Sequence, residues 1–448
     1  MPFDASGSGR PLDIAVVGSG ISGLGAAWLL SRRHNVLLYE KADRYGGHTN
    51  TVVAVARGPG SQTREIPVDT GFIVFNEATY PDLIALFAYL GVECTASEMS
   101  FSASIDGGSI EYAGGTWHGL FAQKRNLLRP SHWRMLADIL RFFREARELC
   151  EAGGDGPDIA TFLARGRYSR AFVDRHLLPM AAAIWSCPTD AMMAFPAHSL
   201  ARFFRNHGLL QVFDRPQWRT VRGGARVYRD AILRDIGPGS LARAGATLVA
   251  PGRNGVIVHD TGGRARRFDH VVMAAHADES LALIAGPSAA ERDILGRFSF
   301  QPNRAVLHQD EGLMPMRRRA WSSWNYLARS GGRLGRTAVS VTYWMNRLQN
   351  LPGDFPLFVS LNPISEPRAG TKLAEFDYMH PVFDAAALEA QRRLPEIQGV
   401  RGLHFCGAWT GHGFHEDGLR SGFAVAEALG VPRPWRARVA ADMPQAAD

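Results

Sequence analysis

The sequence predicts an α/β protein in which a doubly wound, Rossmann-like dinucleotide-binding domain carries an inserted α+β substrate domain. Three observations predict this fold class. A G-x-G-x-x-G string lies between a short apolar strand run and a helical run near the N-terminus. Helical patterns dominate residues 76–215, and aromatic and β-branched runs typical of an antiparallel sheet lie between residues 304 and 361.

The first unit of the chain has the order strand, glycine turn, helix, strand. Residues 14–17 form a short apolar run, residues 24–31 follow a helical pattern, and residues 35–40 form a second strand run. This order is typical of the opening of a doubly wound sheet.

The middle of the chain changes from this pattern to helices. Residues 80–90, 131–151 and 197–206 follow helical patterns between Gly and Pro breaks, which predicts an inserted helical region. The chain then returns to the first domain through a glycine pair and helix within residues 218–233, followed by strand runs at 254–258 and 270–275.

Residues 305–308, 321–326, 339–345 and 357–361 predict the strands of the antiparallel sheet. A strand at 403–407 and a helix at 417–429 close the chain before a loosely held tail. We therefore expect a dinucleotide-binding domain of residues 11–75, 216–290 and 396–430, a substrate domain of 76–215 and 291–395, and a tail of 431–448.

The composition is that of an ordinary globular protein. With 448 residues, 46% of them hydrophobic and 21% charged, the chain is long enough for two or three domains. The net charge of +7 is scattered along the chain, which argues against a nucleic-acid partner. The four cysteines form no C-x-x-C pair, so we expect no disulfide framework and a cytoplasmic location, without a membrane span.

Each glycine of the G-x-G-x-x-G string has a physical task. Gly18 allows the tight turn, Gly20 lets the backbone approach a pyrophosphate, and Gly23 lets the helix and the strand pack closely. The helix N-terminus attracts phosphate charge. Glu40 ends the next strand, where its carboxylate would accept the adenosine ribose hydroxyls.

Two further motifs indicate which dinucleotide is bound. Residues 40–48 read EKADRYGGH, and near the C-terminus residues 404–409 read HFCGAW and residues 416–422 read EDGLRSG. In this order they resemble the FAD-dependent superfamily of amine oxidases, protoporphyrinogen oxidases and carotenoid desaturases. The resemblance implies that FAD is the cofactor and that the C-terminal helix directs its positive N-terminus at flavin N1 and O2.

The resemblance also implies the residues that hold FAD. They are Gly18, Gly20, Ile21, Ser22, Gly23, Glu40, Lys41, Arg44, Gly46, Gly47, His48, Thr70, Gly71, Val249, Gly407, Ala408, Asp417, Gly418 and Leu419.

The chain departs from the amine oxidases at two points of these motifs. It has Gly407-Ala408-Trp409 where amine oxidases often have Gly-Thr-Glu, and His48 where an Arg is common. Residues 68–76, 320–327 and 341–346 are more similar to bacterial flavoproteins that accompany cyclopropane-fatty-acyl synthase-like methyltransferases. That subgroup implies a methylated fatty acid desaturase, with the methyltransferase as a partner.

Few lysines are available for amine oxidation. Amine-oxidising members of the superfamily commonly place a lysine near flavin N5, and this chain has only Lys41, Lys124 and Lys372. Lys372 is the sole candidate left for that place, and we do not expect it to fill it. No second G-x-G-x-x-G occurs, so we expect electrons to leave to oxygen or another acceptor.

Aromatic strands are the candidate wall of a hydrophobic substrate site, with core packing as the alternative. Strand alternation predicts that Trp324 and Tyr326 face opposite to Asn325, and that Tyr343 and Met345 face opposite to Trp344. These residues are the candidates for substrate binding, and Tyr343 is also a catalytic candidate.

Two histidines precede the C-terminal helix. His412 or His415 could move a proton during C–H abstraction, or could be hydrogen-bonded within the loop. Their spacing is not that of H-E-x-x-H zinc sites, so we expect no metal.

Residues 117–144 combine aromatic and aliphatic side chains with arginines. Such a segment could contact the anionic inner face of a membrane, or be an ordinary helix with its apolar face on the core.

The sequence thus predicts an enzyme that removes two hydrogens from a hydrophobic substrate, with the hydride going to flavin N5 and a C=C bond forming. A methylated fatty acyl chain of a phospholipid is the expected substrate. An amine oxidase, a reduced-flavin isomerase or mutase without net oxidation, and a methyltransferase partner with structural FAD remain open as alternatives.

Overall fold

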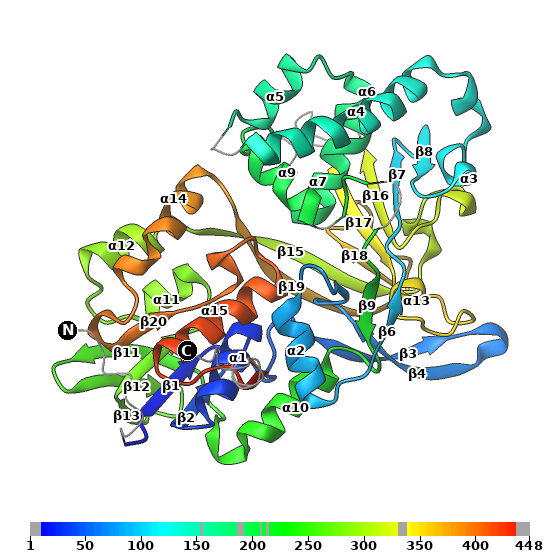
Figure 1. Ribbon diagram of the computed structural model, residues 1–448. Helices are drawn as coiled ribbons and strands as arrows, with labels where there is room; N and C mark the ends of the chain where they lie inside the picture. The colour runs from blue at the N-terminus through cyan, green and yellow to red at the C-terminus, as the bar shows by residue number, and fades with distance from the viewer. Residues whose placement is uncertain are drawn as a thin grey trace, which may run out of the picture.

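The computed structural model describes residues 10–152, 156–185, 192–206, 208–211, 215–329 and 338–435 (Figure 1). Its architecture is built around two large sheets, one parallel and one mostly antiparallel. The N-terminal lead up to residue 9 and the end of the predicted tail, residues 436–448, lie outside the described residues.

The parallel sheet has five strands in the order β10-β2-β1-β14-β20. All four neighbouring pairs run parallel, and β1 lies at the centre with Ile14 to Val17 buried. Their bounds are β1 Asp13–Val17, β2 Asn35–Tyr39, β10 Leu241–Ala242, β14 His270–Met273 and β20 Leu403–Phe405. A central parallel strand is covered on both faces, which explains its continuous apolar sequence.

Helices cover one face of this sheet, and a small antiparallel sheet with further helices covers the other (Figure 1). The first face carries α1 (Ile21–Leu30), α2 (Pro81–Leu90), α10 (Arg226–Ile236) and α15 (His415–Ala428). The second face carries β11 (Ala246–Gly252), β12 (Gly255–Asp260), β13 (Ala265–Phe268), α11 (Ala277–Leu283), α12 (Ala289–Leu295) and α14 (Ala385–Arg393).

The second large sheet has seven strands in the order β19-β15-β18-β17-β16-β7-β8. Within this sheet, only β16 and β7 pair in parallel. The bounds of the seven strands are β7 Phe101–Ile105, β8 Ile110–Ala113, β15 Ser299–His308, β16 Trp324–Arg329, β17 Ala338–Trp344, β18 Phe358–Leu361 and β19 Lys372–Val382. The short helix α13 (Met345–Leu348) follows β17.

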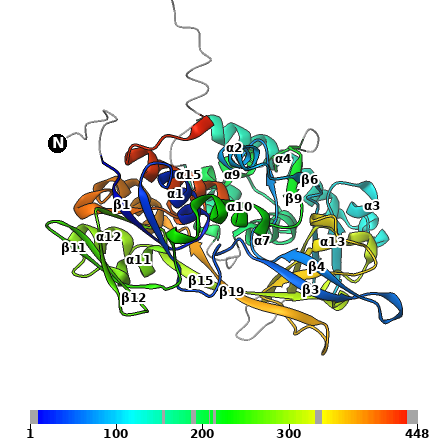
Figure 2. The same ribbon diagram turned by 90° about the horizontal axis from the view of Figure 1, so that it is seen from below.

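One face of the seven-stranded sheet is divided between two coverings. Towards the β8 edge, Ala103 on β7 and Tyr326 on β16 are buried under helices. Towards β15, Ala305 and Val341 pack against the ribbon of β3 (Thr51–Arg57) and β4 (Thr63–Asp69), which Figure 2 shows from below. The helices are α3 Trp117–Leu120, α4 Pro130–Ala152, α5 Ile159–Arg165, α6 Arg170–Phe172, α7 Leu178–Trp185 and α9 Ala197–Asn206.

A third, three-stranded sheet joins the two halves of the molecule. It has the order β5-β9-β6, with β5 Phe75–Asn76, β9 Trp218–Val221 and β6 Cys94–Ser97. Within the described ranges, no helix combines the length and the apolar character that crossing a membrane requires.

The predicted fold class is confirmed, and several elements differ in detail. Residues 76–215 are not purely helical, because β6, β7 and β8 lie among the helices and β7 extends the large sheet. The strand expected from Trp321 begins at Trp324, since Trp321 follows a 3-10 turn and its indole donates to the Pro315 carbonyl. The expected tail begins as packed structure, with Val431 buried against the helical core. The domain boundaries stay a prediction.

The other face of the seven-stranded sheet contains a row of buried polar side chains. Asn325 accepts from Ser102 and donates to the carbonyls of Ser322 and Thr342. The Thr342 hydroxyl bonds to Ser360, which in turn bonds to His308. The side chains of this row satisfy one another, so Asn325 has a structural role in the sheet, and its predicted contact with substrate stays a prediction.

We expect Asn325→Ala to lower the free energy of unfolding by about 3 kcal/mol, because it leaves several buried groups without a hydrogen-bond partner. Urea denaturation followed by tryptophan fluorescence measures the change. The control Asn254→Ala, at an exposed turn, should stay within about 0.5 kcal/mol of the wild type. Equal effects of the two variants would contradict the structural role of Asn325.

Candidate functional site

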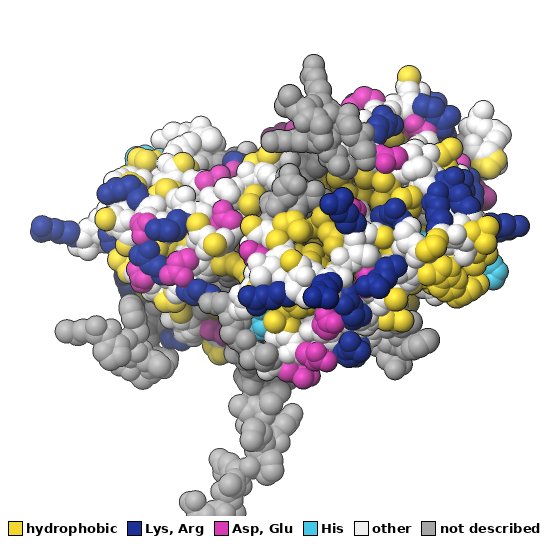
Figure 3. All heavy atoms as spheres, turned by 90° about the horizontal axis from the view of Figure 1, so that it is seen from above, with side chains coloured by type: hydrophobic (Ala, Val, Ile, Leu, Met, Phe, Trp, Pro, Cys, Tyr) yellow, Lys and Arg dark blue, Asp and Glu magenta, His cyan; other side chains and the backbone are white. Residues whose placement is uncertain are grey.

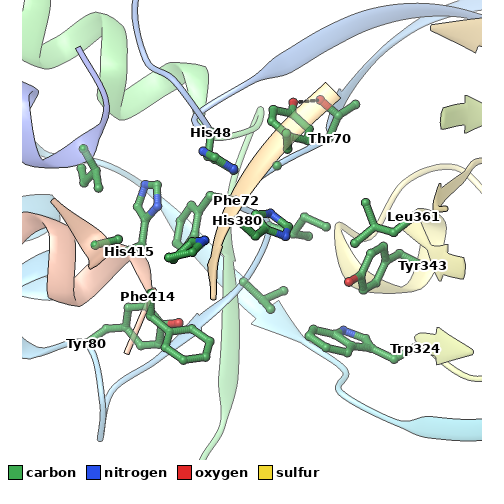
Figure 4. Close-up of a pocket in the computed structure, with 18 of the residues that line it drawn as sticks. His48, Thr70, Phe72, Tyr80, Trp324, Tyr343, Leu361, His380, Phe414 and His415 are labelled. Atoms are coloured by element: carbon green, nitrogen blue, oxygen red, sulfur yellow. Dashed lines mark hydrogen bonds between the residues drawn. The ribbon is translucent and has the colours of Figure 1, made fainter. Parts of the chain in front are cut away.

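A cavity of about 1650 Å³ lies between the parallel sheet and the seven-stranded sheet. Gly18, Gly20 and Glu40 line one end of it. The other end is lined by Trp324 and Tyr343 of the large sheet and by apolar residues of α4 (Figure 4). The cavity therefore joins the two regions that the sequence predicts for cofactor and substrate.

The first glycine string has the predicted geometry. Gly18 has a φ of +103°, and a Cβ on Gly23 would lie 1.9 Å from the Gly18 carbonyl oxygen. A Cβ on Gly20, in contrast, would meet nothing within 4 Å, and no side chain caps the N-terminus of α1 that follows it. The start of α1 thus presents an open backbone surface to the cavity, suited to a pyrophosphate.

The second glycine pair lies against the first. Gly47 has a φ of +56°, and its Cβ would come within 3.1 Å of the Gly20 Cα. The Ser19 hydroxyl accepts from the Gly46 amide, and the Arg44 guanidinium donates to the Gly47 carbonyl at 2.8 Å. Two backbone segments from distant parts of the motif therefore form one cradle.

The acidic residue after β2 lies at the same end of the cavity. The Glu40 carboxylate accepts from the amides of Ser19 and Ala42, which holds it at the carboxyl edge of the sheet. Lys41 also lines this end, and its ammonium pairs with Glu279 at 2.5 Å. Ile21, Ser22, Arg44, Gly47, Gly407 and Ala408 complete the predicted residues that line this end.

Several predicted cofactor residues lie behind the cavity wall. Asp417 accepts from the amides of His412 and Phe414, so its carboxylate caps its own helix. A Cβ on Gly418 would approach Ile21, and Leu419 is fully buried in the core. These residues, with Gly23 and Gly46, shape the backbone around the cavity without lining it.

Val249 does not line the cavity either. Its side chain is buried in the core beside β12, and its carbonyl accepts from the Ala285 amide at 2.8 Å. The predicted contact of Val249 with the cofactor stays a prediction.

Aromatic and histidine side chains surround the middle of the cavity (Figure 4). His48 stacks on Tyr378 and on His380, with ring centroids 4.8 and 5.4 Å away. The Tyr378 hydroxyl bonds to Thr70 and accepts from Asn50, and the backbone of Gly71 packs on the His48 carbonyl. Burial and the neighbouring histidines hold the pKa of His48 well below its usual value, so the ring is neutral.

The two histidine candidates for catalysis lie at different positions, His412 in the loop before α15 and His415 as the first residue of this helix. His415 lines the cavity, stacks on Phe72 at 3.8 Å, and its Nε2 bonds to the Tyr228 hydroxyl at 2.6 Å. Burial lowers its pKa to about 3, which keeps it uncharged. His412 does not line the cavity, because its loop turns inward to the Asp417 carboxylate, so the structure gives it no direct place in catalysis.

The aromatic wall consists of side chains on one face of the large sheet. Trp324 on β16 meets Tyr343 on β17 edge to face, with centroids 5.0 Å apart. The indole N–H of Trp324 is buried without a hydrogen-bond partner. His48 also lines the cavity and has a buried ring nitrogen, Nε2, without a hydrogen-bond partner.

Three more of the predicted substrate contacts do not line the cavity, and their role in substrate binding stays a prediction. Tyr326 shares the face of Trp324 but lies two residues farther along, under the helices. Trp344 points to the opposite face, where it packs against Trp321. Met345 begins α13 and is fully buried beneath the sheet. Strand alternation gave the faces correctly, while the position of the covering helices decided which residues reach the cavity.

The other two lysines do not line the cavity. Lys372 begins β19 and pairs with Glu375 on an exposed surface, and Lys124 is exposed beside α3. The substrate end of the cavity therefore has no lysine amine. In the described parts of the chain, no group of three His, Cys, Asp or Glu side chains is arranged to hold a metal ion.

Sequence reasoning missed Phe72, Tyr378 and His380. The last two lie on β19, where every second residue, Phe376, Tyr378 and His380, shares one face of the strand. The ring side chains at every second position were the signal in the sequence that could have identified them. No comparable pattern marks Phe72, which lies in a loop after β4.

Comparison with known proteins begins with the N-terminal unit. Residues 16–90 match the family model of an NAD(P)-binding Rossmann-like domain. A protein of Mycobacterium tuberculosis named as a flavin-containing monoamine oxidase, AofH, is 27% identical over 278 residues, which cover 57% of this chain and 55% of that protein. The alignment thus spans about half the length of this relative.

Solved structures share the whole fold. A cyclohexylamine oxidase from Brevibacterium oxydans superposes with a TM-score of 0.68 at 17% identity, and a fatty acid isomerase from P. acnes, described as producing CLA, with 0.67 at 13% identity. Each alignment covers 94% of this chain and 99% of the other. The fold with two large sheets is therefore the fold of these proteins.

A buried carboxylate couples α15 to α2 beside the cavity. Glu416, in the first turn of α15, accepts from the amides of Asp82 and Leu83 at the start of α2, at 2.8 and 3.0 Å. This contact satisfies two amides that the first turn of a helix leaves without partners. Burial nevertheless raises the pKa of Glu416 to about 7.

The pKa of Glu416 is higher in the native protein than in the unfolded chain. Between about pH 4.5 and 7, a larger fraction of Glu416 is therefore protonated in the native state than in the unfolded state. Its stabilising contribution is complete below this window and is lost as the pH rises through it. We expect the wild type to lose about 2 kcal/mol more than Glu416→Gln between pH 4.5 and 8. Urea denaturation at several pH values measures this, and the exposed control Glu389→Gln should keep the wild-type slope. Identical slopes in all three proteins would contradict the assignment.

Proposed function

We propose that the chain is an FAD-dependent oxidoreductase that removes two hydrogens from a methylated fatty acyl chain of a phospholipid and forms a C=C bond. One observation carries the proposal. A single cavity joins an open backbone cradle of glycines to an apolar, aromatic wall without a lysine amine. The comparisons support the broader part, a flavin oxidoreductase of the amine oxidase and protoporphyrinogen oxidase superfamily.

The residues at the first end of the cavity fit FAD. The space beside Gly20 is open, the adjoining helix start is uncapped, and Glu40 is placed to accept ribose hydroxyls. His48, whose buried Nε2 has no hydrogen-bond partner, lines the same cavity farther along. The relative named as flavin-containing supports FAD over NAD. When bound, FAD supplies the acceptor for a hydride.

The protein's own part is to orient the substrate and to exclude water. The wall of Phe101, Trp324, Tyr343 and Leu361 provides an apolar surface. His415 is held neutral and these four wall residues carry no charge, so the substrate meets an apolar surface there, while Glu98 and Arg215 are charged residues that also line the cavity. The cradle and Glu40 would hold FAD, which would supply the hydride acceptor for this two-electron oxidation; the substrate's proton would be released to water, and dioxygen or another acceptor would take up the electrons.

An acyl chain suits the far end of the cavity better than a small amine. Apolar side chains from α4, α7 and α9 line it, among them Leu136, Phe143, Met180 and Phe203. A fatty acid isomerase shares the fold, which supports the accommodation of such a chain by this architecture. A fatty-acyl methyltransferase, the partner implied by the sequence motifs, would supply the methylated substrate.

Two other activities have specific support. The names of AofH and of the cyclohexylamine oxidase favour an amine oxidase, and the fatty acid isomerase favours a reaction without net oxidation. The lack of a lysine amine at the substrate end argues against the first.

Anaerobic mixing with phospholipids that carry methylated acyl chains should bleach the visible absorbance of the flavin, and oxygen should restore it. Phospholipids with unmethylated chains are the control and should bleach it more slowly. Bleaching by cyclohexylamine or polyamines and not by lipid would establish the amine oxidase instead. A shifted double bond in the lipid without any bleaching would establish the isomerase.

Gly20→Val should give a folded protein without flavin. The φ of −59° at Gly20 suits any residue, and nothing in the protein lies within 4 Å of the new Cβ, so folding should be unaffected. The side chain would fill the pyrophosphate position, and we expect flavin affinity to fall at least about tenfold. Circular dichroism and flavin absorbance per protein measure the two effects. The control Gly353→Val, where a Cβ also meets nothing, should keep its flavin; flavin retained by Gly20→Val would contradict the cradle.

A further inference from the structure

We infer that the surface around α3 and the start of α4 docks onto an anionic lipid bilayer. We call this surface the rim and define it by Trp117, Leu127, Leu128, Trp133 and Leu140. The inference rests on the proposed function and deepens it, because an enzyme that acts on a phospholipid must reach its substrate in a bilayer. The docking itself is independent of turnover and can be measured without it.

Large apolar side chains are exposed together on the rim. Leu128 is 88% exposed, Trp117 60% and Leu140 59%. Trp117 and Trp133 lie 6.1 Å apart and both pack on Phe121, and the Trp133 indole donates to the Leu127 carbonyl. These contacts bring the two tryptophans and Leu127 of the rim together, and large apolar side chains exposed together are typical of an interaction site.

The charge around the rim is mostly positive, and the carboxylate within residues 117–140, Asp138, is buried and pairs with Arg134 and Arg141. From residue 112 to residue 137 the chain contains no Asp or Glu, but it contains Lys124, Arg125, Arg129 and Arg134. Arg125 and Arg129 donate to the Ser109 carbonyl, and neither they nor Lys124 form an ion pair with a carboxylate in the described part of the chain. Their positive charge therefore stays available to an external anion.

The rim is continuous with the substrate end of the cavity. Trp133, Leu136, Leu140 and Phe143 repeat at helical spacing along α4, and all four line the cavity. Trp133 and Leu140 are at the same time exposed. Figure 3 shows this helical side from above, with apolar side chains gathered around a hollow and Lys and Arg side chains at its edges. An acyl chain could thus pass from a bilayer into the cavity along apolar surface.

A bilayer fits these observations better than a protein partner. Exposed tryptophans are typical of side chains placed at a membrane interface, and neighbouring basic residues are attracted by anionic headgroups. Each such residue strengthens binding about fivefold, an effect that salt screens. The basic side chains match the anionic headgroup layer, and the apolar side chains between them match the acyl layer beneath it.

The test is co-sedimentation of the full-length protein with vesicles at low salt. The vesicles are of phosphatidylcholine alone or mixed with phosphatidylglycerol, both with saturated, unmethylated chains, which are poor substrates under the proposed function. We expect the wild type to bind the anionic vesicles and to be released by high salt. Leu128→Glu should weaken this binding at least tenfold, and Lys124→Glu about tenfold or more. Val400→Glu is the matched control, an exposed apolar side chain far along the chain that should bind as the wild type does.

Two results would overturn the inference. One is a wild type that stays in the supernatant with anionic vesicles, and the other is a Leu128→Glu variant that binds as the wild type does. If the wild type binds no vesicles and Leu128→Glu changes its oligomeric state, the rim is instead a contact with a second copy of the chain. Flavin reduction by detergent-dispersed lipid, measured separately on the same variants, should be unchanged. Failure of docking and failure of the proposed reaction are therefore distinguishable.

Discussion

The burial of α1 on all sides is the constraint on which the rest of the structure depends. All ten residues of this helix are buried between the parallel sheet and α15. Such close approach is possible only where side chains are missing, because a Cβ on Gly422 would lie 2.2 Å from the Ser22 carbonyl and one on Gly25 would meet Leu419. The helix start is therefore held rigidly at the edge of the sheet. The cradle, the entry of α15 and the cap of α2 all take their positions from it.

One face of the seven-stranded sheet has three parts. Helices cover the part near β16 and β7, the β3–β4 ribbon covers the part near β15, and the strip between them faces the cavity. The opposite face has a buried hydrogen-bonded row from Ser102 to His308, which fixes the register of the central strands. The side chains of the wall are placed by a rigid sheet, and the helices decide how far the cavity extends.

Local sequence predicted what local physics determines. The strand-glycine-helix unit, the bounds of α9 and the opposite faces of Tyr343 and Trp344 follow from backbone sterics and periodicity within a few residues. Distant parts of the chain decide which predicted site residues reach the cavity. Tyr326 and Trp324 share a face, and only the distant helices decide that one is core and the other is cavity. Likewise, the inward turn that removes His412 depends on a carboxylate five residues later, whose role as a cap the motif did not reveal.

The scarcity of lysine has a consequence for the chemical durability of the site. Oxidation of unsaturated lipids yields aldehydes and conjugated electrophiles, which react with amines and thiols. The substrate end of the cavity has no amine, and the described cysteines Cys94, Cys150 and Cys406 are absent from its lining. An arginine guanidinium, in contrast, stays protonated and is a poor nucleophile. If the substrate is a lipid, the enzyme would work beside reactive products without offering them an amine or a thiol at that end, and the neutral histidines of the cavity would be the nucleophiles left.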